Sequence, residues 1–239
     1  MKINPKYRVL AASTSTVFGS SYLEYIIDDA VKFLNADEIL FVPYARPSGA
    51  TYDEYTESPK KAFDQKGIKV IGLHEFDDPK EAIRNAKAIF IGGGNTFLLL
   101  KTLYELDLID ELKAVVSNEV PYMGTSAGSN ICGIDIGTTN DMPIVYPPSF
   151  EALGFLPFNI NPHYLDPDPN SKHKGETRET RIYEFHKFNA QPVVGLREGS
   201  WIEVEQGNAV LKGPLTARIF RQGTEPVEMN DFGILDERL

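Results

Sequence analysis

Ser126 is flanked by Gly124 and Gly128, and the apolar residues 120–123 come directly before this pentapeptide. The pattern Gly-x-Ser-x-Gly after an apolar run is typical of a serine nucleophile on a sharp turn between a strand and a helix. The glycines are needed there because a side chain on either side of the serine would collide with the neighbouring strand or helix. The pattern therefore predicts nucleophilic chemistry at Ser126. The alternative is a tight turn with a solvated serine, because small residues gather in turns for many reasons.

The same turn predicts a place for negative charge. The hydroxyl of Ser126 would lie at the N-terminus of the following helix, where unpaired N–H groups and the helix dipole stabilise an oxyanion. The backbone N–H of Ala127 is the first candidate donor. We therefore expect an acyl-transfer site at this turn.

A serine hydroxyl needs a base within hydrogen-bonding reach, and the base needs an orienting partner. The chain has four histidines. His163 is the best candidate because Asn161-Pro162 restricts the chain before it and a strand edge can then aim its imidazole. We interpret His74 and His186 as structural, and His173, which stands between two lysines, as solvated or substrate-facing.

The candidate for the orienting acid is Asp141. It is the one charged residue in the stretch 137–150. The alternative role for Asp141 is an Asx turn before Pro143. With Asp141 as the acid, the candidate triad has the chain order Ser126, Asp141, His163.

These residues need a scaffold, and the chain alternates apolar strand patterns with amphipathic helix patterns. The expected strands are residues 7–12, 38–44, 68–73, 86–91 and 120–123, with helices expected at 22–34 and 52–65 and after the glycine turn 92–94. Nearly all-apolar strands between helices predict an α/β fold with a mostly parallel sheet covered on both faces. Ligands bind beyond the carboxyl ends of such strands, so both glycine-rich turns should reach one rim.

The last quarter of the chain has a different pattern. Short apolar segments at 193–196, 201–205, 209–211 and 217–220 are separated by glycines. This spacing predicts antiparallel hairpins that complete the sheet. No repeat or linker divides the chain, so we expect one catalytic domain over residues 1–239.

Several segments together resemble the peptidase E (α-aspartyl dipeptidase) group of the S51 serine peptidase family. They are residues 91–97, 124–128, 138–144, 160–163, 173–178 and 199–202. The family has a class I glutamine amidotransferase-like, flavodoxin-like fold, which agrees with the strand and helix pattern. One departure is Thr125, where bacterial members carry a bulky tryptophan before the serine, so the shape of the adjoining subsite does not follow from the resemblance.

The resemblance implies roles for particular residues. Ser126 matches the nucleophile, His163 the general base and Asp141 the third triad member. The turn at 92–94 matches the second oxyanion-hole element, with Gly93 or Gly94 as the donor beside Ala127. The implied activity is hydrolysis of dipeptides with an N-terminal L-aspartate through an acyl-enzyme, with no cofactor and no metal.

An acidic substrate raises an electrostatic question, because the chain has a formal net charge of −10. Residues 172–181 are an exception, with four cations against two glutamates. We expect Arg178 to clamp the substrate carboxylate, because a planar guanidinium matches a carboxylate better than an ammonium does. Arg181 and His173 are further candidates for substrate binding. The alternative for Arg178 is a surface salt bridge with Glu176 or Glu179.

Composition limits the partners and the location. The acidic charge argues against nucleic acid and anionic membranes, which need a basic surface. The single cysteine, Cys132, fits a reducing compartment, and neither a signal peptide nor a membrane span is evident. We expect a cytoplasmic monomer or homodimer that acts on a small acidic dipeptide.

Two other functions stay open. A cyanophycinase-like or isoaspartyl-cleaving S51 hydrolase would use the same triad on a different linkage. A non-catalytic binding protein with the amidotransferase-like fold would use the turn at 92–94 to hold an anion, because a glycine-rich turn before a helix is a general anion site.

Overall fold

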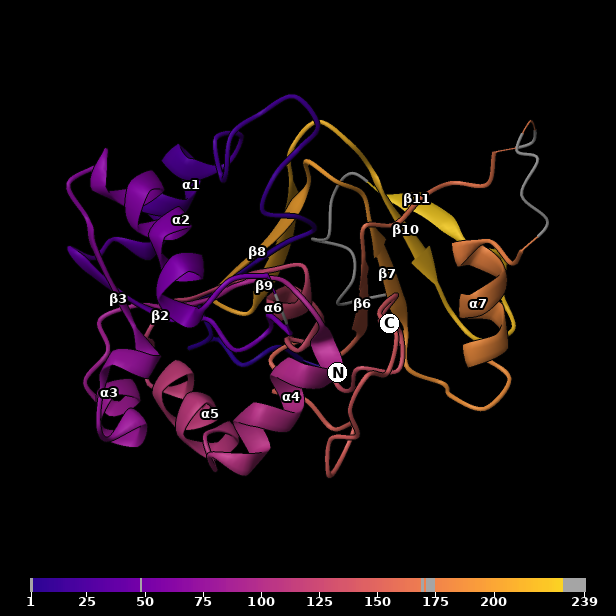
Figure 1. Ribbon diagram of the computed structural model, residues 1–239. Coiled ribbons are helices and arrows are strands. Elements are labelled where there is room, and N and C mark those ends of the chain that lie inside the picture. Colours follow the sequence, from indigo (N-terminus) through magenta and orange to yellow (C-terminus); the bar gives the residue numbers. More distant parts are fainter. Residues whose placement is uncertain (1, 48, 169, 171–174, 230–239) are drawn as a thin grey trace.

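The computed structural model describes residues 2–47, 49–168, 170 and 175–229, which form two β-sheets with helices around them (Figure 1). The larger sheet has the strand order β3-β2-β4-β5-β1-β8-β9, and its first five strands are parallel. These five are β1 (Val9–Ala12), β2 (Glu38–Val42), β3 (Lys69–Gly72), β4 (Ile89–Ile91) and β5 (Tyr122–Thr125). The expected α/β fold with a mostly parallel sheet is confirmed.

Helices cover both faces of this sheet. They are α1 (Ile27–Leu34) and α2 (Tyr52–Asp64) on one face, and α3 (Pro79–Arg84), α4 (Thr96–Glu105) and α5 (Ile109–Ser117) on the other. The strand residues alternate accordingly, because successive side chains of a strand point to opposite faces. Leu10 packs in the cluster that contains Phe33, whereas Val9 packs in the cluster that contains Leu103. Within the described residues, no helix is long and apolar enough to cross a bilayer.

The C-terminal strands divide between two sheets. The hairpin of β8 (Trp201–Glu205) and β9 (Asn208–Lys212) extends the large sheet, as expected. A second sheet has the order β11-β10-β7-β6 and contains β6 (Asn159–Pro162), β7 (Val193–Leu196), β10 (Ala217–Phe220) and β11 (Val227–Met229). The expectation that β7 and β10 complete the first sheet is therefore wrong, because β6 offers β7 a parallel partner of its own.

Helix α7 (Arg178–Phe185) covers the second sheet. Its residue Ile182 packs in a cluster with Tyr164, Val193 and Phe220. Helix α7 lies on the face of the second sheet that points away from the large sheet (Figure 1). The two sheets therefore meet on the opposite side of β6 and β7.

Ser13, which directly follows β1, connects the two sheets. Its N–H donates to the carbonyl of Ser200 at 3.1 Å, and its hydroxyl donates to the carbonyl of Leu196 at 2.7 Å. The hydroxyl also accepts from the N–H of His163 at 2.9 Å. The carboxyl ends of β1, β6 and β7 are thereby held together, and the functional residues lie at these ends.

Candidate active site

Ser126 lies on a strained turn between β5 and the short helix α6 (Ala127–Asn130). Its φ and ψ are 53° and −107°, and its N–H donates to the carbonyl of Ala12 at 3.1 Å. A Cβ on Gly124 would collide with the backbone of Gly128, and a Cβ on Gly128 would collide with the backbone carbonyl of Ile91. Both flanking positions therefore require glycine. The strand-to-helix turn expected from the sequence is present.

His163 is the partner of this serine. Its Nε2 lies 2.8 Å from Oγ of Ser126, and it follows the last residue of β6 with φ of 53°. The contact with Ser13 fixes the backbone of His163 at this unusual angle. The pairing of Ser126 with His163 that the sequence predicts is present, and the serine has an acceptor for its proton.

The residue on the other side of the imidazole is Glu198. Its Oε1 lies 2.6 Å from Nδ1 of His163, in a contact whose two side chains are 35% and 43% exposed for His163 and Glu198 respectively. Strands β6 and β7 are paired in parallel with Pro162 opposite Leu196, so the residues that follow both strands meet. Glu198 is not among the residues that the sequence predicts for the site. The only signal for it is this strand pairing, which no local pattern reveals.

The expectation that Asp141 orients His163 is therefore wrong. Oδ2 of Asp141 accepts from the N–H of Thr96 at 2.7 Å and from its hydroxyl at 2.6 Å. Thr96 is the first residue of α4, and the unpaired N–H groups of a helix N-terminus attract a carboxylate. Asn140 donates from Nδ2 to the carbonyl of Pro162 at 2.6 Å, which anchors this loop beside the His163 strand.

The turn 92–94 lies against Ser126. A Cβ on Gly93 would lie 3.0 Å from Cβ of Ser126. The Tyr55 hydroxyl donates to the carbonyl of Gly93 at 2.9 Å, which fixes that peptide group, and Gly94 has φ of 144°. In a trans peptide the N–H points opposite to the C=O, so the N–H of Gly94 points away from Tyr55. Within the described residues, neither the N–H of Gly93 nor that of Gly94 donates to another group.

Arg178 and Arg181 lie in the first turns of α7, which begins after the N-cap Thr177. They line a cleft together with Leu165 and Asp166, which follow His163 in the chain. Burial and the nearby charge of Arg181 lower the pKa of Arg178, and the charge of Asp141 opposes this shift. The third substrate-binding candidate, His173, lies outside the described residues.

The alternative role for Arg178 receives no support from the described contacts. Glu179 pairs with Arg218 at 3.0 Å, on the far strand β10. Within the described residues, Arg178 forms no ion pair.

The remaining histidines and the cysteine are away from Ser126. Nε2 of His74 lies 2.8 Å from Oδ1 of Asp53, and Nε2 of His186 lies 3.1 Å from the carbonyl of Gln191. Cys132 is fully buried, and burial raises the pKa of its thiol. His74 and His186 thus have structural surroundings, as expected from the sequence.

Comparisons with known proteins identify the family of this chain. The model of Peptidase family S51 matches residues 9–212. Peptidase E of Streptomyces coelicolor is 52% identical over 232 residues, which cover 97% of this chain and 94% of that protein. A Drosophila melanogaster protein named "Probable alpha-aspartyl dipeptidase" is 47% identical over 223 residues, which cover 91% and 92%.

A solved structure supports the fold. The crystal structure of a peptidase from an acI-B1 Actinobacterium superposes with a TM-score of 0.72 at 15% identity, and the match covers 96% of this chain and 95% of that one. The matched family span includes Ser126, His163 and Glu198. With this span and the identity to curated relatives over nearly the whole chain, the protein belongs to peptidase family S51.

Proposed function

We propose that this chain is a serine-type dipeptidase that hydrolyses dipeptides with an N-terminal L-aspartate. The observation that carries the proposal is the hydrogen-bonded series Ser126–His163–Glu198, with contacts of 2.8 and 2.6 Å. Peptidase E and α-aspartyl dipeptidase are the names of its similar relatives. The arginine-lined cleft beside the series supplies the reason for an acidic substrate.

The proposed reaction is acyl transfer through Ser126. Its Oγ attacks the carbonyl carbon of the aspartyl residue while Nε2 of His163 takes the hydroxyl proton. His163 then gives that proton to the leaving amine, and water hydrolyses the acyl-enzyme by the reverse sequence. Glu198 accepts from Nδ1–H, which keeps the imidazole in the tautomer whose Nε2 is free to accept.

The oxyanion of the tetrahedral intermediate needs hydrogen-bond donors close to the substrate's carbonyl oxygen. We assign these to the N–H groups of Ala127 and of Gly93 or Gly94, which flank Ser126. Each such donor is worth about 3 kcal/mol of transition-state stabilisation. The hydrogen bond from Tyr55 to the carbonyl of Gly93 supports this assignment, because it holds the turn still.

The side-chain carboxylate of the substrate belongs in the cleft at the start of α7. Arg178 is partly buried there and is not neutralised by a described glutamate, so it attracts an anion despite the net charge of −10. A guanidinium binds a carboxylate through two parallel hydrogen bonds. Arg181, one helical turn further on, adds a second positive charge.

The first test is a comparison of Asp-Leu, Glu-Leu, Asn-Leu and isoaspartyl-Leu with purified protein, with and without a chelator. Rapid, chelator-insensitive cleavage of Asp-Leu alone is expected. Cleavage of isoaspartyl-Leu in its place would favour a cyanophycinase-like activity. Absence of cleavage, together with no labelling by a serine-directed phosphonate, would favour a binding protein.

The clamp has its own test. Arg178→Ala should raise KM for Asp-Leu strongly and remove the preference for Asp-Leu over Asn-Leu. Lys187→Ala, a cation beyond the end of the same helix, is the control and should leave both properties unchanged. Unchanged selectivity in Arg178→Ala would move the clamp to Arg181.

The cellular location remains part of this proposal. We place the enzyme in the cytoplasm, because its one cysteine is buried as a free thiol and a reducing compartment suits it.

A further inference from the structure

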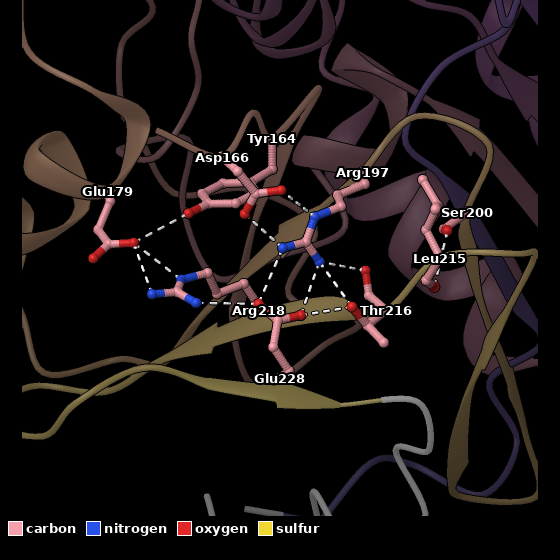
Figure 2. A network of polar contacts seen from close by, with 9 residues as sticks. All are labelled: Tyr164, Asp166, Glu179, Arg197, Ser200, Leu215, Thr216, Arg218 and Glu228. Carbon is pink, nitrogen blue, oxygen red and sulfur yellow. Dashed lines mark hydrogen bonds and ion pairs between the residues drawn. The ribbon is translucent and has the colours of Figure 1, made fainter. Parts of the chain in front are cut away.

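All three guanidinium nitrogens of Arg197, the residue before Glu198, donate hydrogen bonds (Figure 2). Its Nε and Nη2 donate to the two oxygens of Asp166 at 2.8 and 2.7 Å. Its Nη1 and Nη2 donate to the two oxygens of Glu228 at 2.9 and 3.0 Å. Nη1 also donates to the carbonyl of Thr216 at 2.8 Å. One guanidinium thus holds two carboxylates, each through two hydrogen bonds.

The contacts connect the two segments that carry the base and its acid. Asp166 is three residues after His163, and Arg197 directly precedes Glu198. Both segments leave the ends of paired parallel strands, β6 and β7, where the sheet no longer holds them. The bidentate pair of Asp166 and Arg197 joins them beyond the sheet, next to the contact between His163 and Glu198.

Glu228 extends the connection to α7. It accepts from Arg218 at 3.1 Å, and Arg218 also donates to Glu179 at 3.0 Å. Glu179 follows Arg178 in the helix. Figure 2 shows this series of alternating charges running from Arg197 across β10 and β11 to Glu179. This set of ionic contacts therefore includes the residue before the acid Glu198 and the residue after the proposed clamp Arg178.

The charges in this set stabilise one another. The side chain of Arg197 is 14% exposed, and its N–H groups lower the pKa of Glu228 to about 2. They also lower the pKa of Asp166, and both carboxylates raise the pKa of Arg197. All three groups are ionised at neutral pH, so the contacts are charge-assisted and hold their geometry strongly.

We propose that Asp166, Arg197 and Glu228 are positioning residues that hold Glu198 against His163 and thereby set the rate of serine attack. The proposal rests on the proposed function, because it assumes that the His163–Glu198 pair activates Ser126. Glu228 lies on β11, beyond the span 9–212 that matches the family model. A residue of the C-terminal strand therefore acts on catalysis without contact with the substrate.

The test uses the full-length variants Glu228→Gln and Asp166→Asn. We expect each to reduce kcat on Asp-Leu about tenfold, because small displacements of catalytic groups cost up to about a hundredfold in rate. KM should stay within twofold for Glu228→Gln, whereas Asp166 lines the proposed substrate cleft, so Asp166→Asn is judged by kcat and labelling alone. The rate of Ser126 labelling by a serine-directed phosphonate should fall by the same factor. Asp166→Asn leaves the contacts of β11 intact and serves as the second variant if Glu228→Gln folds poorly.

The matched control is Glu111→Gln, which removes a bidentate pair with Arg84 between α3 and α5. It should leave kcat and the labelling rate unchanged. If Glu228→Gln and Asp166→Asn also label at the wild-type rate, the positioning role is wrong and the contacts serve folding alone. If the wild-type protein itself is not labelled, the proposed function fails first, so the two failures are distinguishable.

Discussion

The two halves of the candidate site are held by different forces. On the nucleophile half, Ser126 and the turn at 92–94 are set by backbone contacts that leave no space for a Cβ. On the base half, His163 and Glu198 follow the free ends of β6 and β7 and lie beside the ionic contacts of Arg197. The first half depends on close packing of an apolar sheet, and the second depends on partly exposed charges.

This difference predicts different sensitivities. Steric contacts between backbone atoms do not depend on pH or salt. They are disrupted when a small residue such as glycine is replaced by a larger one. Ionic contacts between partly exposed groups weaken gradually with salt and with protonation. The effects of substitutions in the two halves should therefore differ in how they depend on pH and salt, and not only in their magnitude.

The largest effect is expected at Ser126. Ser126→Ala should lower kcat by about 10⁶-fold, the loss measured when a comparable serine hydrolase loses its nucleophile. Because φ of 53° strains any residue with a Cβ, Ser126→Gly should be about 1 kcal/mol more stable than Ser126→Ala. Urea unfolding of the two variants measures this difference. Equal stabilities would argue against strain at the nucleophile.

The next largest effect distinguishes the two candidate acids. Glu198→Gln should lower kcat about 10⁴-fold, as in a comparable triad, because an amide no longer selects the useful tautomer of His163. Asp141→Asn should keep kcat within about tenfold, because an amide oxygen can still accept from Thr96. It should cost at most about 1 kcal/mol of stability through the lost charge at the N-terminus of α4. A loss in Asp141→Asn as large as in Glu198→Gln would return Asp141 to the catalytic machinery.

The same contrast explains how far the sequence could predict the site. Ser126 and His163 carry local signals, in flanking glycines and in a preceding Asn-Pro, and the parallel sheet follows from apolar periodicity. Glu198 has no such signal, because its role depends on the pairing of β6 with β7. Asp141 looked suitable in a region without other charges, but its carboxylate accepts from the N–H of Thr96 at the N-terminus of α4. Long-range strand pairing and helix caps thus account for both errors.

The next prediction concerns the close packing of the turn between β5 and α6. Gly128→Ala should destabilise the protein by about 1–3 kcal/mol and reduce kcat, because its Cβ would collide with the backbone carbonyl of Ile91. Gly154→Ala is the matched control, since nothing lies within 4 Å of its Cβ and only its φ of +65° is unfavourable. The control should lose about 1–2 kcal/mol without a change in kcat. Urea unfolding and kinetics on Asp-Leu measure both.

A smaller effect is expected at Tyr55. Tyr55→Phe removes the hydrogen bond to the carbonyl of Gly93 but keeps the ring that packs edge-on against Phe41. The net contribution of a hydrogen bond of this kind is about 1 kcal/mol, so kcat should fall by roughly fivefold to tenfold with little change in KM. Tyr25→Phe, which loses a hydrogen bond to the carbonyl of Thr14, is a suitable comparison for stability. An unchanged kcat would mean that the glycine turn holds its own shape.

The smallest effect separates the two halves by pH. The N–H groups of Arg197 lower the pKa of Glu228 to about 2, well below the 4.5 of a free glutamate. Ionised Glu228 therefore contributes its full stabilisation above pH 4.5, and this contribution is lost as the pH falls from about 4.5 to 2. Because its side chain is 40% exposed, the solvent screens the gain, and we expect a difference in Tm of at most about 4 °C between wild type and Glu228→Gln at pH 7.

That difference should shrink as the pH falls below 4.5, because the glutamate of the unfolded chain then binds a proton whereas that of the folded protein stays ionised down to about pH 2. The stability lost in Gly128→Ala should stay constant over the same pH range, because its cause is steric. Thermal unfolding of wild type and both variants between pH 7 and pH 3 measures this. A difference for Glu228→Gln that is as large at pH 3 as at pH 7 would show that the base half is held by packing as well, and the contrast between the halves would then be one of degree.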